Sequence, residues 1–421
     1  MNKPYVVIGI QLYKKMCLLD SRGHRYNTLK PWNEDTIRKE LRKLEFSKSE
    51  IDKYLCDIPI YDHHIYMPDH INYKQVVNNQ YNLYQELVFK PKKGDFPNTM
   101  ILLKHIFGRQ LEISLDYLQL IYLKPLQILP ILVLVSSIRG TGKTTFFNWL
   151  KLIFSSNMIL KEADNLKSRF NSELEGKIIS AIEDTEYLRH QSIIDKIKNY
   201  STAISYQSEA KGCNRTEVSL FVKFIISSNN EEDLLKLDSE EIRFWVVKVR
   251  AIAEENLDTD ILNKLELEVP AFLYFLKHRK LSIPKAKSRM WFAPKDIRTE
   301  NLDIMIRNNL EISERELAIL LYEIMDDSDL NSVDLRPIDA VELLKSIKIN
   351  VDTPKMRNIL KDRWKLKCKD NSFNYEKPEP IRGGNYIFTR SKGKFFTVTK
   401  DFLLNKFGDL VTGQDNYLYN S

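Results

Sequence analysis

The chain has 421 residues, of which 43% are hydrophobic and 11% aromatic, which is enough apolar material for two or three packed domains and excludes a disordered chain. Its net charge of +7 is compatible with a polyanionic partner without requiring one. Four cysteines lie far apart without paired spacing, which argues against a disulfide framework or a cysteine zinc site and predicts reduced thiols.

The N-terminal region, residues 1–125, is expected to be mixed and helical, with a short strand at 5–10 and a polar helix near 34–44. His63 and His64 are adjacent, so in a strand they would point to opposite faces. A polar turn is therefore favoured there over a metal site or a nuclease. The most apolar window, 118–135, contains a lysine and two prolines and is not expected to cross a membrane. Without a recognisable targeting signal, we expect a cytoplasmic protein.

Residues 131–147 form the most informative segment, because an apolar β-branched run leads through a small-residue loop into helical periodicity. In a phosphate-binding loop, backbone N–H groups converge on phosphate oxygens, Lys143 reaches the β- and γ-phosphates, and the Thr144 hydroxyl binds Mg²⁺. The consensus opens with glycine where this chain has Ser137. We predict a nucleotide site against the alternative of a chance Gly-Lys-Thr. Its expected residues are Ser137, Arg139, Gly140, Thr141, Gly142, Lys143, Thr144 and Thr145.

Residues 126–252 alternate strand-like and helix-like segments, as in an α/β nucleotide-binding domain. Glu183 and Asp184 end an apolar strand, at the edge where ligands bind in parallel sheets. One of these acids is expected to contact Mg²⁺ through water and the other to orient the attacking water, and the sequence does not assign which. The alternative is a strand that ends in solvated acids.

Two further polar residues flank later apolar strands. Asn229 is placed to hydrogen-bond the γ-phosphate or the attacking water, although asparagine is also common in turns. Arg243 is a candidate arginine finger for a nucleotide on a neighbouring subunit, and the alternative is an ordinary salt bridge to Glu240 or Glu241.

The segment between the acids and Asn229 carries basic residues around a Lys-Gly loop tip. In a ring-shaped motor such a tip would project into the pore and grip a nucleic acid backbone. A plain exposed turn is the alternative. The candidate DNA-binding residues are Lys198, Lys211 and Arg215.

The order of these parts resembles superfamily 3 helicases, which are AAA+ motors of viruses, phages and plasmids. The parts are Gly-Thr-Gly-Lys-Thr-Thr, Ile-Glu-Asp, Glu-Ala-Lys-Gly, Ile-Ser-Ser-Asn-Asn and Ile-Arg-Phe-Trp-Val-Val. Residues 1–250 look more closely like the primase-helicase proteins of Bacteroidetes phages and mobile elements. The resemblance implies a hexameric ring that hydrolyses ATP with Mg²⁺ and translocates on single-stranded DNA during replication in a bacterial host.

By motif match, the resemblance also implies roles for single residues. These are Lys143 and Thr144 for phosphate and metal, Glu183 and Asp184 as the acidic pair with Asp184 at the metal, Asn229 as sensor, Arg243 as finger and Lys211 as the pore lysine. The family often has a second arginine where this chain has Ile242. Nothing matches a primase domain, which leaves open a primase or polymerase acting in trans.

Beyond the core, residues 253–300 are expected to be a helical, basic linker and 301–421 a winged-helix-like domain. A hairpin is predicted at 386–398, with its turn at 391–393. Trp364, Phe395 and Phe396 are expected in a core. A nearby strip of basic residues faces either phosphates or solvent, and it comprises Lys361, Arg363, Lys365, Lys367 and Lys369.

The predicted fold class is thus α/β, an AAA+ P-loop ATPase core with a helical N-terminal region and a C-terminal winged-helix-like α+β domain. The predicted function is an ATP-dependent DNA helicase that travels as a homo-oligomeric ring. The alternative is a non-translocating, ATP-switched replication initiator or loader that binds or melts origin DNA. A signalling ATPase and a packaging motor rank lower, because neither receptor-like repeats nor a nuclease is recognised.

Overall fold

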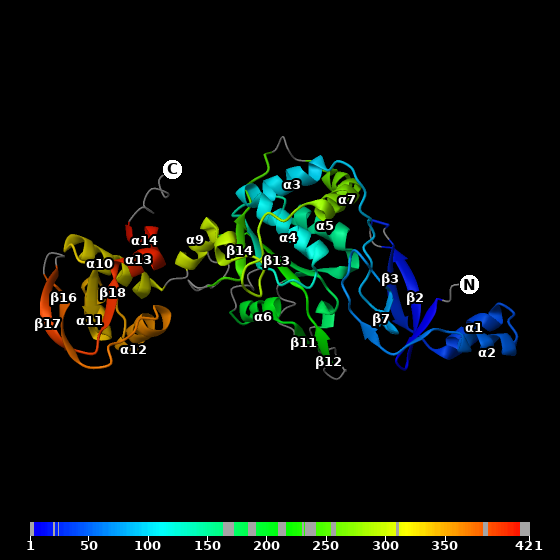
Figure 1. Ribbon diagram of the computed structural model, residues 1–421, viewed down its shortest axis with the longest axis horizontal. Helices are drawn as coiled ribbons and strands as arrows, with labels where there is room; N and C mark the ends of the chain where they lie inside the picture. Colours follow the sequence, from blue (N-terminus) through cyan, green and yellow to red (C-terminus); the bar gives the residue numbers. More distant parts are fainter. Residues whose placement is uncertain are drawn as a thin grey trace. The chain divides into compact units, whose positions relative to one another are not determined.

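Figure 1 shows the computed structural model of the chain. The residues it describes are 4–19, 22–23, 25–162, 172–183, 191–208, 216–229, 231, 241–253, 258–308, 311–381 and 386–412. The chain divides into two compact units. Unit 1 comprises Met1–Lys236 and Glu241–Asp303, and unit 2 comprises Leu237–Glu240 and Ile304–Ser421.

The centre of unit 1 is a five-stranded parallel sheet with the order β14-β8-β13-β10-β9. Its strands are β8 (Ile131–Val135), β9 (Met158–Glu162), β10 (Ile179–Glu183), β13 (Lys223–Ser228) and β14 (Phe244–Lys248). β8 and β13 are buried along their whole length, as expected for parallel strands that are covered on both faces. Because β13 lies between β8 and β10, the loops that follow these three strands meet at the carboxyl edge of the sheet.

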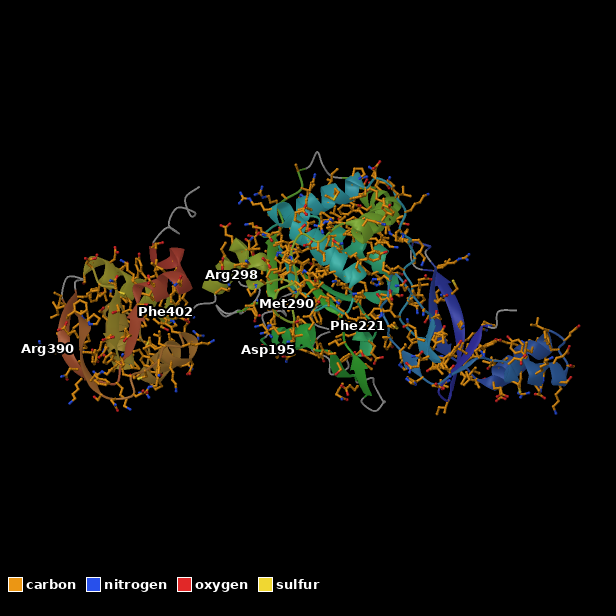
Figure 2. All side chains as sticks on the ribbon, viewed as in Figure 1. Asp195, Phe221, Met290, Arg298, Arg390 and Phe402 are labelled. Carbon is orange, nitrogen blue, oxygen red and sulfur yellow. The ribbon has the colours of Figure 1, made fainter. Side chains whose placement is uncertain are left out.

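Helices cover both faces of this sheet (Figure 1). One face packs against α3 (Pro97–Phe107), α4 (Leu111–Leu123), α5 (Lys143–Phe154) and α7 (Ile261–His278). α6 (Gln191–Thr202) contacts β13 and contributes a separate buried apolar stripe. The largest buried side chains fill the space between sheet and helices (Figure 2). Trp149 packs on Phe272 with ring centroids 5.2 Å apart, and Trp245 stacks on Phe107 at 5.5 Å.

The segment 253–300 is not the linker that was expected. It contains α7, whose Leu265, Val269 and Phe272 are fully buried in the main core of unit 1. These residues are spaced by four and three positions and so lie on one helix face. The polar residues at both ends of the segment suggested a linker, although the helix between them carries an apolar stripe.

The N-terminal part of unit 1 is more β-rich than expected. A sheet of order β3-β2-β1-β4 packs against two helices, each of which begins at a side-chain cap, Asn33 or Ser47. These elements are β1 (Tyr5–Ile8), β2 (Gln11–Leu19), β3 (Arg25–Pro31), β4 (Ile60–Tyr61), α1 (Glu34–Lys43) and α2 (Lys48–Cys56). A small sheet follows, with β5 (His64–Ile65), β6 (Val76–Val77) and β7 (Gln80–Asn82). His64 therefore begins a short strand.

The remaining elements of unit 1 are short. They are η1 (Gly108–Gln110), η2 (Ser155–Asn157), η4 (Ser172–Leu174), the paired strands β11 (Ser205–Ser208) and β12 (Thr216–Ser219), α8 (Pro294–Ile297) and α9 (Glu300–Asn308), which crosses into unit 2. None of the helices in the described ranges is long and apolar enough to span a bilayer.

Unit 2 is an α+β unit with its own core, in which Trp364 and Phe396 are buried as expected. Its elements are α10 (Ile312–Asp327), β15 (Ser332–Leu335), α11 (Pro337–Ser346), α12 (Thr353–Asn358), the π-helical turn η7 (Ile359–Arg363), β16 (Phe373–Pro380), β17 (Tyr386–Gly393), β18 (Phe396–Thr399), α13 (Lys400–Phe407) and α14 (Asp409–Thr412). β15 pairs with β18 and β16 pairs with β17, both antiparallel. The winged-helix assignment stays a prediction.

The predicted hairpin turn at 391–393 is wrong. These residues belong to strand β17, where Ser391 pairs with Tyr375 and Lys392 with Asn374. Gly393 is not among the glycines with positive φ, so it does not supply the left-handed conformation of a tight turn. The partner of β17 is the upstream strand β16, which pairs with it from Phe373 opposite Gly393 to Pro380 opposite Tyr386.

Candidate nucleotide-binding site

The loop between β8 and α5 has the backbone of an anion site. Gly140 and Gly142 have φ of +70° and +85°, a region that glycine enters without strain. Gly142 is the N-cap of α5, so no side chain caps this helix, and its first turn contains no acidic residue. The first N–H groups of a helix have no intrahelical acceptors. An anion such as a phosphate is therefore the natural partner of this helix end.

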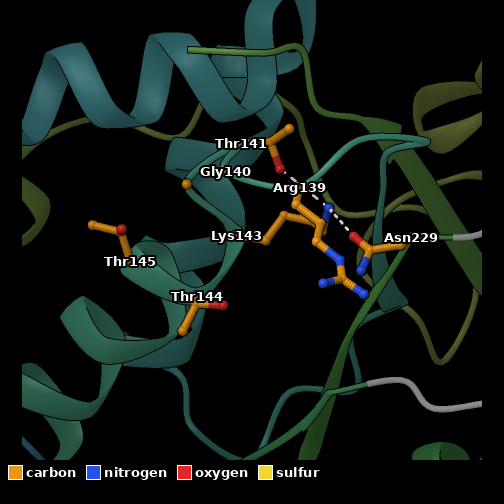
Figure 3. Close-up of a pocket in the computed structure, with 8 residues that line it drawn as sticks. Arg139, Gly140, Thr141, Lys143, Thr144, Thr145 and Asn229 are labelled. Atoms are coloured by element: carbon orange, nitrogen blue, oxygen red, sulfur yellow. Dashed lines mark hydrogen bonds between the residues drawn. The ribbon is translucent and has the colours of Figure 1, made fainter. Parts of the chain in front are cut away.

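Lys143 lies at the centre of the site, with only 8% of its surface exposed. Its ammonium donates to Thr141 Oγ1 and to Asn229 Oδ1, each at 3.1 Å (Figure 3). Burial lowers the pKa of Lys143, and the nearby carboxylate of Glu231 opposes that shift. Both acceptors are neutral, so a phosphate oxygen in their place would give a stronger, charge-assisted bond.

A pocket of about 360 Å³ opens beside this lysine. It is lined by Arg139, Gly140, Thr141, Gly142, Lys143, Thr144, Thr145 and Asn229. Seven of the eight predicted loop residues therefore share one pocket with Asn229. The eighth, Ser137, is exposed, and its backbone N–H donates to Glu231 at 2.6 Å instead of facing the pocket.

The acidic strand end meets the same loop. The Thr144 hydroxyl donates to Glu183 Oε1 at 3.1 Å, and Glu183 is the last residue of β10. A hydroxyl and a carboxylate side by side are oxygen ligands of the kind that Mg²⁺ prefers, with waters and phosphate completing its shell. Thr144 and Glu183 thus fit a magnesium ion. Asp184 lies outside the described residues, and within those residues no three metal-ligating side chains cluster.

Asn229 reaches Lys143 because of the strand order. It directly follows β13, which lies between β8 and β10 in the sheet. The amide therefore stands between the phosphate loop on one side and Glu183 on the other. The structure brings together Lys143, Thr144, Glu183 and Asn229, and their chemical roles remain predictions.

Two residues near the site were not predicted. Glu231 accepts from Ser137 and from the Lys248 ammonium at 2.7 Å. Burial raises the pKa of Glu231, but the hydrogen bonds from Lys248 and Ser137 outweigh it and hold that pKa below its usual value. An acid just after Asn229 was a usable sequence signal. His105 of α3, with Nε2 at 3.1 Å from the Thr141 carbonyl oxygen, gave none, because 36 residues separate the two.

Arg243 lies at the opposite edge of the sheet from the pocket. Its backbone carbonyl accepts from the N–H of Ile131, the first residue of β8. The loop that leads to Lys143 follows the last residue of that strand, at its other end. Five residues of strand span roughly 16 Å. Arg243 is therefore too far from the pocket of its own chain to contact a phosphate there.

The Arg243 guanidinium makes an ion pair within its own chain. Its Nε donates to Glu241 Oε1 at 2.9 Å and its Nη2 to Oε2 at 3.2 Å. The same carboxylate accepts from Lys198 at 2.8 Å, and the Lys198 side chain is only 9% exposed. Lys198 therefore does not present a free ammonium to a DNA backbone in this structure. The other two candidate DNA-binding residues, Lys211 and Arg215, lie outside the described residues.

Comparisons with known proteins support the fold. A protein-family model described as a family of unknown function (DUF5906) matches residues 134–243, which run from the phosphate loop to Arg243. No curated protein matches the sequence. The apo C-terminal region of NrS-1, residues 305–718 of that protein, aligns with a TM-score of 0.61 and 13% identity over 94% of this chain and 95% of that one.

A second apo structure of the NrS-1 C-terminal region, its A form, aligns with a TM-score of 0.61 and 14% identity over 94% and 96% of the two chains. JCV helicase with a bound substituted acetamide reaches a TM-score of only 0.31 at 12% identity, over 52% of this chain and 63% of that one, which is too low to support an argument. The chain is thus similar in fold to the NrS-1 C-terminal region along nearly its whole length.

Proposed function

We propose that this protein hydrolyses ATP and acts as a DNA helicase of the superfamily 3 type. One observation carries the proposal: groups from three different strand ends come together, since Lys143, Thr144 and Asn229 line one pocket and the Thr144 hydroxyl donates to Glu183. A phosphate site alone needs only the loop. The added carboxylate and amide are what phosphoryl transfer to water requires beyond binding.

Each group has a task that its position allows. The N–H groups at the start of α5 and the Lys143 ammonium would bind the β- and γ-phosphates, while Thr144 and Glu183 would hold Mg²⁺, which supplies charge neutralisation when bound. Asn229 would hydrogen-bond the γ-phosphate or the attacking water. Glu183, 3.1 Å from the Thr144 hydroxyl, would also be close enough to orient that water.

The helicase part rests on the order of the five motifs and on Arg243. An arginine at the far edge of the sheet cannot contact the pocket of its own chain, so we propose that Arg243 serves a pocket on an adjacent subunit. Head-to-tail contacts of this kind close into rings. We therefore propose a homo-oligomeric ring with an AAA+ core that moves on single-stranded DNA during replication of a phage or mobile element, with a primase or polymerase acting in trans.

The test compares Lys143→Ala with Lys277→Ala, an exposed lysine on α7. ATP hydrolysis is measured with and without single-stranded DNA, and solution mass with a non-hydrolysable nucleotide. We expect Lys143→Ala to lose about 100-fold or more of the turnover, because one of the main phosphate contacts is gone. Lys277→Ala should behave as wild type. Unchanged hydrolysis in Lys143→Ala would refute the proposed site.

The DNA arm separates the two candidate functions. Strong stimulation of wild-type turnover by single-stranded DNA, together with a hexamer-sized particle, supports the translocating motor. Slow ATP turnover that does not change when single-stranded DNA is added would instead support an ATP-switched initiator or loader, which uses the same nucleotide site without translocating.

A further inference from the structure

Unit 2 carries an uneven charge distribution that the nucleotide site does not explain. Residues 353–369 include seven basic residues and one acidic residue, a net charge of +6 in a chain whose total is +7. The preceding stretch of the same unit, residues 311–352, has 11 acidic and four basic residues, a net charge of −7. The positive charge is therefore concentrated on one short segment.

The first part of this segment is an amphipathic helical turn. α12 and η7 bury Met356, Ile359 and Leu360 in the core of unit 2. Arg357 and Lys361 are exposed and four residues apart, so they lie on the same outer face. Among the residues that the structure describes, neither makes an ion pair.

The second part is extended, and its lysines alternate with core residues. Leu366 and Cys368 pack against the core, whereas Lys365, Lys367 and Lys369 are exposed. Side chains alternate between the two faces of an extended segment, so Lys367 and Lys369 share the outer face, whereas Lys365 has a φ of +53° and precedes the extended part. The Lys369 N–H donates to the carbonyl of Phe395 at 2.9 Å. The exposed Lys394 directly precedes Phe395 and therefore lies beside these lysines.

Two other cations of the segment are engaged with the acidic half of unit 2. Lys355 pairs with Glu311, and Arg363 donates to Glu314 at 2.6 Å. These pairs connect the start of α10 to α12 through Lys355 and to the end of η7 through Arg363. We define a basic strip that consists of the exposed Arg357, Lys361, Lys367, Lys369 and Lys394.

An exposed aromatic ring lies close to this strip in sequence and in space. Phe373 is 50% exposed, begins β16 and pairs in register with Gly393, the neighbour of Lys394. Figure 2 labels Arg390, which lies on the same strand β17 as Gly393. An exposed aromatic ring beside a row of lysines is the combination by which proteins bind single strands, since lysines contact phosphates and the ring stacks on an unpaired base.

We propose that the basic strip and Phe373 form a binding site for single-stranded nucleic acid on unit 2, separate from the nucleotide pocket. The exposed ring favours a single strand over a duplex, whose bases are already stacked. It also favours a nucleic acid over an acidic protein, which offers no stacking face.

The test measures binding of a fluorescent 20-nucleotide single strand and a 20-base-pair duplex to the full chain without ATP, at several salt concentrations. Lys361→Gln/Lys367→Gln removes two charges of the strip. Lys345→Gln/Lys348→Gln removes two exposed charges elsewhere in unit 2 and is the matched control. Phe373→Ala removes the ring. Thermal unfolding and DNA-free ATP hydrolysis should be unchanged in all three variants, because the substituted side chains are exposed.

Each lost phosphate contact reduces the salt slope for a single strand by about 0.7. Losing two should therefore weaken binding about 60-fold at 50 mM salt and about threefold at 500 mM. The control should match wild type, and Phe373→Ala should weaken single-strand binding about tenfold while sparing the duplex. If the double strip variant fails to fold, Lys367→Gln alone should give about an eightfold loss at 50 mM salt.

Several results would overturn the site. Equal losses in the strip variant and the control would mean that net charge alone matters. If the duplex binds as tightly as the single strand and loses as much affinity in the strip variant, and Phe373→Ala has no effect, the ligand of the strip is a duplex backbone and not a single strand. Displacement of the oligonucleotide by polyglutamate at equal charge concentration would point to an acidic protein partner instead.

Discussion

The carboxylate of Glu241 is the most heavily used polar group at the base of β14. Its side chain is 1% exposed and accepts from Lys198, from the Arg243 guanidinium, and from the backbone N–H groups of Ile242 and Arg243. Glu241→Gln keeps the shape but removes the charge, and it turns one acceptor into a donor that faces two cations. The change therefore tests how much this junction contributes to stability.

The magnitude follows from what is left behind. Without the carboxylate, the Lys198 ammonium, 9% exposed, has lost its only ion-pair partner among the described residues. Removing one member of a buried ion pair typically costs about 3–5 kcal/mol, mostly because the other charge stays buried. Native domains are stable by only about 5–15 kcal/mol. We expect Glu241→Gln to lower the free energy of unfolding of unit 1 by about 3 kcal/mol or more.

The loss should depend on pH in a defined direction. Burial raises the pKa of Glu241, but hydrogen bonds from Arg243 and Lys198 outweigh it, so the net pKa in the folded protein is lowered. A carboxyl with a lowered pKa contributes stability that is fully present above its unfolded value, about 4.3, and is lost as pH falls through its folded value. The difference between wild type and variant should therefore be constant above about pH 5 and shrink below pH 4.

The assay is urea unfolding followed by tryptophan fluorescence, since Trp245 lies in β14 next to this junction. Glu86→Gln is the control, because Glu86 and Lys90 form an exposed ion pair outside any helix, worth about 0.2–1 kcal/mol. Losses below about 1 kcal/mol in both variants, at neutral pH, would refute the argument that a buried charge cluster anchors Arg243.

Two further predictions follow from buried or distant cations. The Lys223 ammonium donates to the carbonyls of Pro125 and Phe221, and burial lowers the pKa of Lys223 to about 7. The free energy of unfolding should therefore rise by up to about 1.4 kcal/mol per pH unit between pH 7 and 10. Urea unfolding of Lys223→Met at each pH should show no such rise. Arg243→Ala should lose ATP hydrolysis but keep nucleotide binding. An equal mixture of Arg243→Ala and Lys143→Ala subunits should recover about a quarter of the wild-type rate of hydrolysis, because random mixing rebuilds one intact interface in four. No recovery in the mixture would contradict action between subunits.

The geometry of the candidate nucleotide site was predictable because its signals are local. Glycines at two left-handed positions, a lysine at the first helical residue and acids at a strand end each occur within a few residues in the sequence. Parallel strands then bring their carboxyl ends together without further information. What the sequence did not supply was the strand order, and it is this order that puts Asn229 against Lys143.

The mispredictions arose where distant packing decides the outcome. α7 was assigned to a linker because its flanks are polar, yet its apolar stripe fills the gap beside Phe96 and Trp149. Lys198 was assigned to a DNA surface because it lies in a basic segment, yet Glu241, 43 positions further on, takes it into the interior. In both cases a partner far away in sequence overrides local polarity.

Glu241 and the position of Arg243 bear on one question, whether the protein can hydrolyse ATP as a single subunit. The arginine lies about one strand length from its own pocket, and its guanidinium is held by a carboxylate that is itself held by Lys198. A charge fixed in this way does not swing across the sheet, since leaving Glu241 would take one of two cations away from a buried carboxylate. It is nevertheless 33% exposed, so it can be presented to a neighbour without leaving its anchor. Under the proposed function, a fixed arginine must be approached by a second subunit, so the proposal predicts that assembly is a condition for fast hydrolysis.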